Sequence, residues 1–439
     1  MNTPATGPRH RPLDHVPRPA GPSPAAGKDS ARWPDVFCPP PASAARTAVA
    51  GLVVRRALAA LPLRVRWEDG PVTGREGPLL RIHAPRAFLG RLGRDGLIGF
   101  GESYMAGEWD ADDLVGVLTV LASHVTELVP KPAQRLRGVW ARRHPTAQRN
   151  TLTGARENIH RHYDLSNDLF AAFLDDTMSY SSAVFDGFPG DREGLAAAQH
   201  RKIDRLLDLA GVGAGTRLLE IGTGWGELAL RAARRGADVV TLTLSDQQRD
   251  LARRRIADAG CADRVTVELC DYRHATGSHD AVVSVEMIEA VGEEYWPVYF
   301  ATLARLLAPG GRIALQAITM PHRRMLATRR THTWIHKYVF PGGIIPSTEA
   351  IAQHAGAAGL RVATDDGFGA HYAETLRLWR ERFTARAPQV AALGFDATFR
   401  RMWEFYLAYS EAGFRARYLD VRQFTLTAAH PAAPHGGSR

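Results

Sequence analysis

Apolar residues follow two alternating patterns along the chain from about Ser182 onward. Short, nearly continuous apolar runs predict buried strands, and the stretches between them place apolar residues at helical spacing. The first predicted helix covers 198–209, and the predicted strands are 217–221, 239–244, 264–269, 281–285 and 312–317. This alternation predicts an α/β fold with a doubly wound, mostly parallel sheet and helices on both of its faces. A ligand is expected just beyond the carboxyl ends of the strands.

The chain before this alternation is organised differently. Residues 43–128 contain strand-like runs at 63–67 and 79–82, a Gly-rich segment at 96–107 and a helix-like run at 114–121, which predict a smaller N-terminal α+β domain. Residues 1–42 are rich in Pro, Ala, Gly and Ser and are therefore expected to form a disordered N-terminal tail. Residues 429–439 are expected to form a second tail at the end of the chain. Residues 129–157 are rich in Arg and indicate a basic linker, with a solvated surface as the alternative. The main domain then covers 158–428.

Composition and charge narrow the class of protein. The 439 residues are 45% hydrophobic, but no apolar run approaches the eighteen or so residues of a membrane-spanning helix, and no basic-then-apolar signal pattern begins the chain. A net charge of +9 and a pI near 9.7 indicate an anionic partner, either nucleic acid or an acidic membrane surface. Three scattered cysteines are too few for a disulfide framework or a zinc site. We therefore expect a cytoplasmic protein with no metal.

The most informative motif is the glycine turn that follows the first predicted strand. Gly222, Gly224 and Gly226 stand at alternate positions between the strand and a helix, in the pattern E-x-G-x-G-x-G. The pattern has neither the spacing of a dinucleotide site nor the Lys-Ser/Thr of a phosphate loop. Glycines here let the backbone approach a ligand at the start of the helix. The alternative is a tight turn that binds nothing.

This turn resembles motif I of S-adenosylmethionine methyltransferases, which have the class I doubly wound fold. The region from about Gly96 to Leu426 resembles the cyclopropane fatty acid synthase family, which includes the mycolic acid methyltransferases. Six stretches carry the resemblance in the same order: 158–168, 177–182, 218–227, 271–273, 337–343 and 406–415. The resemblance implies that S-adenosylmethionine is the methyl donor.

Candidate donor-binding residues follow from position and from the resemblance. The resemblance places Thr243 and Gln248 at the ribose and makes Tyr163, Tyr180 and Ser181 cover the donor. Asp271, at the end of the third predicted strand, is suited to accept from the adenine amino group, with a helix N-cap as the alternative role. The complete set is Tyr163, Tyr180, Ser181, Glu220, Gly222, Gly224, Gly226, Thr243, Leu244, Gln248, Asp271 and Tyr272.

The implied reaction makes a second set of demands. An isolated C=C bond that attacks the sulfonium methyl leaves a carbocation, which aromatic faces such as those of Tyr372 and Tyr163 can stabilise. A base must then take a proton from the transferred methyl. In the resembling family this base is a bound bicarbonate, and the positions that match its binding residues here are Ser182, Glu289, Gln316, Ile318 and Tyr372.

Two of these positions depart from the family. Ser182 replaces a Cys and Gln316 replaces a His. Both can still hydrogen-bond an anion or a water, but Gln can neither carry a charge nor shuttle a proton. These departures favour a methylene or methyl branch over the ring of a cyclopropane-fatty-acyl-phospholipid synthase. Glu289 has the alternative role of a carboxylate at a helix start.

The expected substrate is the cis double bond of an unsaturated phospholipid acyl chain. Residues 320–346 interleave basic and apolar side chains, which suits a cap on the inner face of an anionic membrane, with an ordinary insertion packed on the sheet as the alternative. A partner reductase would be needed for a methyl branch. No aromatic-basic RNA module is evident, so no nucleic acid partner is expected. An RNA methyltransferase and an inactive lipid-binding protein remain the competing classes.

Overall fold

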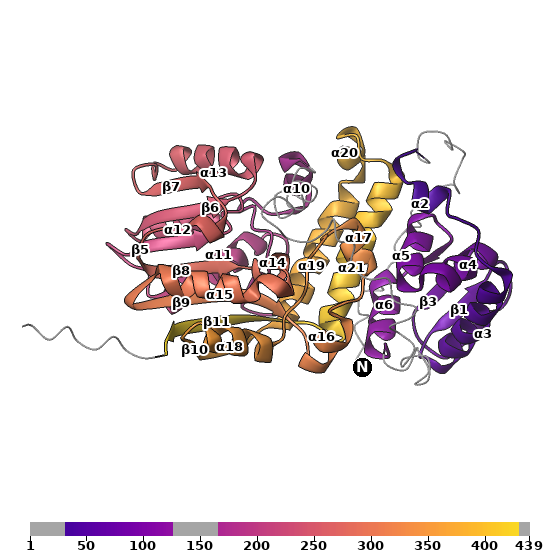
Figure 1. Cartoon of the computed structure of the whole chain (residues 1–439). Helices are drawn as coiled ribbons and strands as arrows, with labels where there is room; N and C mark the ends of the chain where they lie inside the picture. The colour runs from indigo at the N-terminus through magenta and orange to yellow at the C-terminus, as the bar shows by residue number, and fades with distance from the viewer. Residues whose placement is uncertain (1–30, 126–165, 430–439) are drawn as a thin grey trace, which may run out of the picture.

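The computed structural model describes residues 31–125 and 166–429 (Figure 1). Its larger sheet has the order β10-β11-β9-β8-β5-β6-β7, and β11 runs antiparallel to both of its neighbours. The strands are β5 Arg217–Ile221, β6 Asp238–Thr243, β7 Val265–Leu269, β8 His279–Val285, β9 Leu307–Thr319, β10 Leu360–Gly367 and β11 Asp420–Ala428. The predicted doubly wound, mostly parallel fold is confirmed, and each of the five predicted strands corresponds to one of β5–β9.

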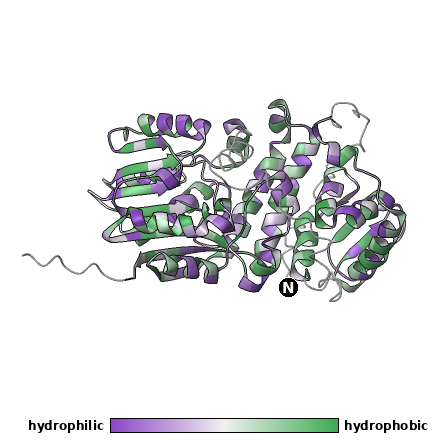
Figure 2. Cartoon of the chain, viewed as in Figure 1, coloured by the Kyte–Doolittle hydropathy of each residue, from purple (hydrophilic) through white to green (hydrophobic). Residues whose placement is uncertain are grey.

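Two layers of helices cover this sheet. α11 Leu195–Ala210, α12 Glu227–Arg234 and α13 Asp246–Asp258 share one core with the strands, and α14 Ile288–Val291, α15 Trp296–Leu306 and α18 Thr348–Ala357 lie with the second core. Neighbouring residues of β5 point to opposite layers, Leu218 to the first and Leu219 to the second, as the pleat of a strand requires. The covering helices carry both colours in Figure 2 because one face of each packs on the sheet and the other meets solvent.

The order of the strands decides where a ligand can bind. From β5 the chain adds β6 and β7 on one side, then crosses to place β8 on the other. The loops after β5 and β8 therefore diverge, which leaves a crevice at the carboxyl end of β5.

The N-terminal residues form a smaller α+β unit. Its sheet has the order β2-β1-β3-β4, from β1 Arg64–Trp67, β2 Val72–Gly74, β3 Leu79–Ile82 and β4 Trp109–Ala111, and its helices are α2 Pro34–Phe37, α3 Ala44–Ala60, α4 Pro85–Asp95, α5 Leu97–Met105 and α6 Leu114–Ser123. The predicted Gly-rich segment is the helix α5. Its glycines are needed for contact: a Cβ on Gly101 would lie 2.4 Å from the Trp334 ring.

Part of the predicted tail 1–42 is folded, which corrects that prediction for residues 31–42. Val36 is buried, and the Arg91 guanidinium donates to the carbonyl oxygens of Asp35 and Val36. The Trp33 indole donates to Asp396 at 2.9 Å, although the two residues are 363 positions apart in the chain. Sequence composition missed these contacts because they come from residues far along the chain. The predicted linker 129–157 lies outside the described residues.

The remaining helices join the two units. α10 Asn167–Phe173, α19 Gly369–Ala385, α20 Ala387–Ala392 and α21 Ala397–Arg415 stand between the large sheet and the N-terminal unit in Figure 1, and α16 His322–Thr328 and α17 Trp334–Tyr338 belong to segment 320–346. Phe405 of α21 contacts the rings of Trp109 and Trp334, at centroid distances of 6.2 and 4.8 Å. The N-terminal unit thus shares one core with the helices beside the sheet.

The same packing changes the picture of segment 320–346. Met325, Trp334 and Val339 are buried, and Lys337 and Tyr338 both donate to the fully buried carboxylate of Glu102. These side chains hold the N-terminal unit against the main domain. Met325, Trp334 and Val339 are therefore interior residues that cannot face a membrane, whereas Leu326 is 44% exposed.

Candidate active site

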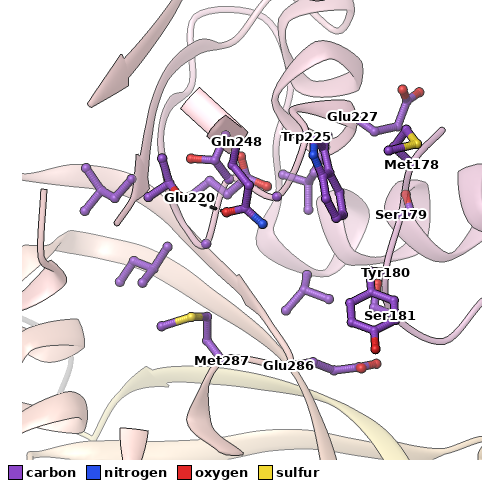
Figure 3. A pocket seen from close by; sticks show the side chains of 18 of the residues that line it. Met178, Ser179, Tyr180, Ser181, Glu220, Trp225, Glu227, Gln248, Glu286 and Met287 are labelled. Atoms are coloured by element: carbon purple, nitrogen blue, oxygen red, sulfur yellow. Dashed lines mark hydrogen bonds between the residues drawn. The ribbon is translucent and has the colours of Figure 1, made fainter. Parts of the chain in front are cut away.

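One pocket opens at the carboxyl end of β5, where the strand order predicts a ligand (Figure 3). The chain turns there between Ile221 and Glu227, and Gly222 and Gly224 take φ values of 102° and 52°, which L side chains rarely adopt. The predicted residues that line the pocket are Tyr180, Ser181, Glu220, Gly222, Gly224, Thr243, Leu244, Gln248 and Tyr272. Residues far apart in the chain therefore meet where the sequence predicted a methyl-donor site.

The glycines of the turn have different surroundings. A Cβ on Gly224 would meet nothing within 4 Å and would extend into the open pocket. A Cβ on Gly226 would lie 3.1 Å from the Cβ of Ala252, and Gly226 does not line the pocket. Gly224 is thus the position at which a ligand can approach the backbone, whereas Gly226 lets α12 pack closely on α13.

Hydrogen bonds fix the polar groups on the floor of the pocket. The Thr241 hydroxyl donates to Glu220 over 2.7 Å, and the Thr243 hydroxyl donates to the Gln248 side-chain oxygen over 2.9 Å. Burial raises the pKa of Glu220 to about 8. A carboxyl and an amide held beside a glycine turn suit the hydroxyls and amino group of a nucleoside-like ligand.

The segment 177–181 covers the pocket from the other side. Arg255 donates to the carbonyl oxygens of Thr177 and Trp225, each at 3.0 Å, and Gln199 donates to that of Ser181. Tyr180, Ser181 and Trp225 line the pocket and are labelled in Figure 3. The residues present fit the methyl donor, because backbone, carboxyl and aromatic groups converge on one cavity that a Cβ at position 224 would enter.

Besides Gly226, the predicted donor-binding residue Asp271 does not line the pocket. Asp271 begins the short 3-10 helix Tyr272–His274, where it accepts from the Arg273 backbone N–H and guanidinium at 3.0 and 2.6 Å. This is the N-cap role that the sequence left open, and Arg273 holds the pKa of Asp271 below its usual range. Tyr163 lies outside the described residues.

The predicted catalytic residues gather at the end of the same pocket, around a residue that the sequence did not single out. Glu286 directly follows β8 and lines the pocket. Its Oε1 accepts from the Ser182 backbone N–H at 3.0 Å and from the Gln316 amide at 2.9 Å, and its Oε2 accepts from the Tyr372 hydroxyl at 2.6 Å. Figure 3 shows the Glu286 side chain pointing toward Tyr180 and Ser181.

Glu289 lies one helical turn further along, in α14. One of its carboxylate oxygens accepts from the Ile318 backbone N–H, and the other is buried without a partner among the described residues. Burial, together with the like charge of Glu286, raises the pKa of Glu289 to about 8. Glu289 is therefore mostly protonated at neutral pH.

Lys202 of α11 completes the buried charges. Its ammonium group donates to the Ser181 hydroxyl at 2.7 Å, and burial lowers its pKa to about 8, although the carboxylates of Glu286, Asp175 and Glu220 oppose that effect. Its positive charge favours the ionised form of Glu286.

The arrangement does not fit a bound bicarbonate. The resemblance assigned Ser182, Gln316 and Tyr372 to that anion, but the Ser182 backbone N–H, the Gln316 amide and the Tyr372 hydroxyl all donate to Glu286 instead. The Ser182 hydroxyl donates to the Ala183 carbonyl oxygen and takes no part. Since a protein carboxylate already receives these hydrogen bonds, a separate anion would have to displace it.

Sequence reasoning missed Glu286, Lys202, Trp225, Glu227 and Met287 among the residues that line the pocket. A signal for Glu286 was present: it is a carboxylate one residue beyond a buried parallel strand, where ligands of this fold bind. The resemblance directed attention to Glu289 instead.

Comparison with known proteins agrees with this geometry. Residues 150–424 match the family described as mycolic acid cyclopropane synthetase, which is more than half of the chain. This chain belongs to that family. It is a methyltransferase that uses S-adenosylmethionine, with the class I fold.

Relatives of this mycolic acid cyclopropane synthetase family cover most of the chain. It is 56% identical over 420 residues to the tuberculostearic acid methyltransferase UfaA1 of Mycobacterium tuberculosis, a match that spans 93% of this chain and 98% of UfaA1. It is 34% identical to the cyclopropane-fatty-acyl-phospholipid synthase of Escherichia coli, over 78% of this chain and 86% of that protein.

Among solved structures, the mycolic acid cyclopropane synthase CmaA1 complexed with SAH and CTAB is 33% identical, with a TM-score of 0.57. The match covers 62% of this chain and 97% of CmaA1. The larger domain therefore carries the family's fold, and the N-terminal unit accounts for much of the remaining length.

Proposed function

We propose that the enzyme transfers the methyl group of S-adenosylmethionine to the cis double bond of an unsaturated phospholipid acyl chain and yields a methylene-branched chain rather than a cyclopropane ring. The observation that carries this proposal is the 56% identity to a tuberculostearic acid methyltransferase over almost the whole of both chains. The ring-forming synthase of Escherichia coli is a more distant relative, at 34% identity.

Aromatic side chains packed on Tyr372 and Tyr180 support a cationic intermediate. The rings of Tyr372 and Phe414 lie 4.6 Å apart, and those of Tyr180 and Trp379 lie 5.3 Å apart. Tyr180 also shares a hydrogen bond of 2.7 Å with the Tyr406 hydroxyl. Aromatic faces contribute about 0.5–2 kcal/mol each to the binding of a positive charge without reacting with it. A carbocation formed here would have time to rearrange before it loses a proton.

Membrane contact and a reductase belong to the proposal as well. Among the described residues, no helix is both long enough and apolar enough to cross a bilayer. The charge of +9 supports binding to an anionic membrane surface, from which an acyl chain would enter the site. Conversion of a methylene branch into a methyl branch needs two electrons that methyl transfer does not supply, so a partner reductase would complete that product.

The experiment is a direct assay of the purified protein. It is incubated with S-adenosylmethionine labelled at the methyl group and with oleoyl phospholipid, and the fatty acid methyl esters are analysed by mass spectrometry. We expect a labelled methylene-branched chain. A labelled cyclopropane as sole product would contradict the branch, and an unchanged double bond despite tight donor binding would contradict the substrate.

A further inference from the structure

The Glu286 carboxylate is held by hydrogen bonds from three separate parts of the chain. Ser182 directly follows the segment 177–181 that covers the pocket, Gln316 belongs to β9 and Tyr372 belongs to α19. The three donating residues are buried, whereas Glu286 itself is only partly buried because it faces the pocket. The side chain is thus fixed in place while its carboxylate remains accessible to a ligand.

The backbone of Glu286 adds a second, independent observation. Its φ of 50° lies in the left-handed region, which is uncommon for a residue other than Gly, Asn or Asp. A residue held there is strained, and such residues cluster at functional sites. The conformation is maintained by the Glu286 N–H, which donates to the Gln316 carbonyl oxygen at 2.7 Å. The strained turn directs the carboxylate into the pocket instead of along the strand.

The chemistry of the three donors also matters. A backbone N–H, an amide and a phenol are all neutral, so they orient the carboxylate without pairing its charge with a cation. The Gln316 amide is itself oriented, because its oxygen accepts from the Gln423 side chain at 3.0 Å and its NH₂ group must therefore face Glu286. Burial raises the pKa of Glu286, which makes its ionised form a stronger base than a carboxylate in water.

We propose that Glu286 is a catalytic residue: its carboxylate removes the proton from the transferred methyl group, so that the enzyme carries its own base and needs no bound bicarbonate. This inference rests on the proposed function. It assigns Tyr372 and Gln316 as positioning residues that act through Glu286, and it leaves Glu289, as a neutral acid, in a supporting position.

The step balances without any further reactant. The π electrons of the double bond form a bond to the methyl carbon as the carbon–sulfur bond breaks and its electrons go to sulfur, which leaves a carbocation on the neighbouring carbon. A hydride shift moves the positive charge to the carbon that bears the methyl group. Glu286 then accepts a methyl proton, and the C–H electron pair forms the methylene double bond. The proton leaves Glu286 for solvent before the next turnover.

Two variants test the role of the carboxylate. E286Q keeps the shape of the side chain but cannot accept a proton, and we expect turnover to fall by about 10²–10⁴-fold. E286G removes the side chain, relieves the positive φ and leaves the three donors without an acceptor. We expect formate, acetate or bicarbonate to raise the turnover of E286G at least tenfold, with a saturable dependence on the concentration of the added anion. The affinity of both variants for S-adenosylmethionine, measured by calorimetry, should stay within about threefold of the wild type.

The wild-type enzyme provides the matched control. In buffer freed of carbon dioxide its turnover should be unchanged, and added bicarbonate should have no effect. A wild type that requires bicarbonate, an E286Q variant with near-normal turnover, or an E286G variant that no small carboxylate rescues would each overturn the assignment of Glu286. If the wild type binds its methyl donor but methylates no unsaturated lipid, the proposed function itself fails. If the wild type and E286Q both form product at similar rates, only the role of Glu286 fails.

Discussion

Glu286 and Gln316 are joined by two hydrogen bonds, one through the side chains and one through the backbone. The Gln316 amide donates to the Glu286 carboxylate at 2.9 Å, and the Glu286 N–H donates to the Gln316 carbonyl oxygen at 2.7 Å. The first bond orients the carboxylate and the second holds the left-handed turn that presents it. Gln316, which departs from the resembling family, therefore holds both the carboxylate and the backbone of Glu286, the candidate base.

Replacement of Gln423 by Leu should alter catalysis through Gln316. Without the donor at 3.0 Å, the Gln316 amide can rotate, and Glu286 loses a well-oriented hydrogen bond that favours its ionised form. We expect the acid limb of the kcat–pH profile to move to higher pH, with little change in KM. T425V is the matched control. Thr425 lies two residues after Gln423 in β11, and its hydroxyl accepts a hydrogen bond of 2.9 Å from the Thr364 hydroxyl. Equal shifts in both variants would indicate a general effect on the sheet.

Replacement of Tyr372 by Phe should remove the hydrogen bond of 2.6 Å to Glu286 and leave the aromatic ring. A hydrogen bond to a charged group is worth about 1.5–3 kcal/mol, so we expect kcat to fall by roughly 10- to 150-fold. Y409F removes the hydroxyl of another Tyr, one on α21 that is 45% exposed and does not line the pocket, and serves as the control. A Y372F variant with normal kcat across the pH range would contradict the positioning role.

Replacement of Glu289 by Gln should change how stability depends on pH. The pKa of Glu289 in the folded protein is about 8, above its ordinary value near 4.5, so its contribution to stability is complete below pH 4.5 and is lost as pH rises through 8. E289Q removes this loss. Urea denaturation of both proteins at pH 5.5 and pH 8 measures the free energy of unfolding of E289Q minus that of the wild type. This difference should increase from pH 5.5 to pH 8, by at most about 1.4 kcal/mol per pH unit.

The activity of the same variant separates the two carboxyls. Because Glu289 is mostly neutral at pH 7, an amide imitates its prevailing form, and E289Q should lose much less turnover than E286Q. The reverse order would identify Glu289 as the base.

Replacement of Gly224 by Val should abolish binding of S-adenosylmethionine by placing a branched side chain in the pocket. The left-handed backbone adds a steric cost of about 1–2 kcal/mol. G260V is a matched control for that cost, since Gly260 also has a positive φ, of 69°, and nothing within 4 Å of its Cβ, but does not line the pocket. Calorimetry should show loss of binding in G224V alone. Unchanged affinity in folded G224V would remove the donor site from this turn.

Binding of the protein to anionic vesicles should weaken as salt rises, because exposed charges are screened over about 8 Å at physiological ionic strength. Sedimentation with phosphatidylglycerol vesicles at increasing salt tests this expectation, and phosphatidylcholine vesicles serve as the control. Equal binding to both lipids would exclude an electrostatic contribution from the net charge of +9.

The sequence by itself determined the frame of the molecule. Apolar runs such as 217–221 predicted the strands of the large sheet because a buried parallel strand needs apolar residues on both faces. The turn at Gly222 and Gly224 predicted the donor pocket because its backbone conformation is available to few residues other than Gly. Ser182, Gln316 and Tyr372 were likewise singled out from the resemblance.

Only the tertiary structure decided what these residues do together. Asp271 became the partner of Arg273, Trp334 of the predicted membrane cap became buried beside Gly101, and three donors converged on Glu286. The three donors lie 30, 86 and 104 positions from Glu286 in the chain, so no local pattern records their meeting. Spacing along the chain determines which element a residue belongs to, but the partner of a hydrogen bond is decided by the packing of elements that are distant in sequence.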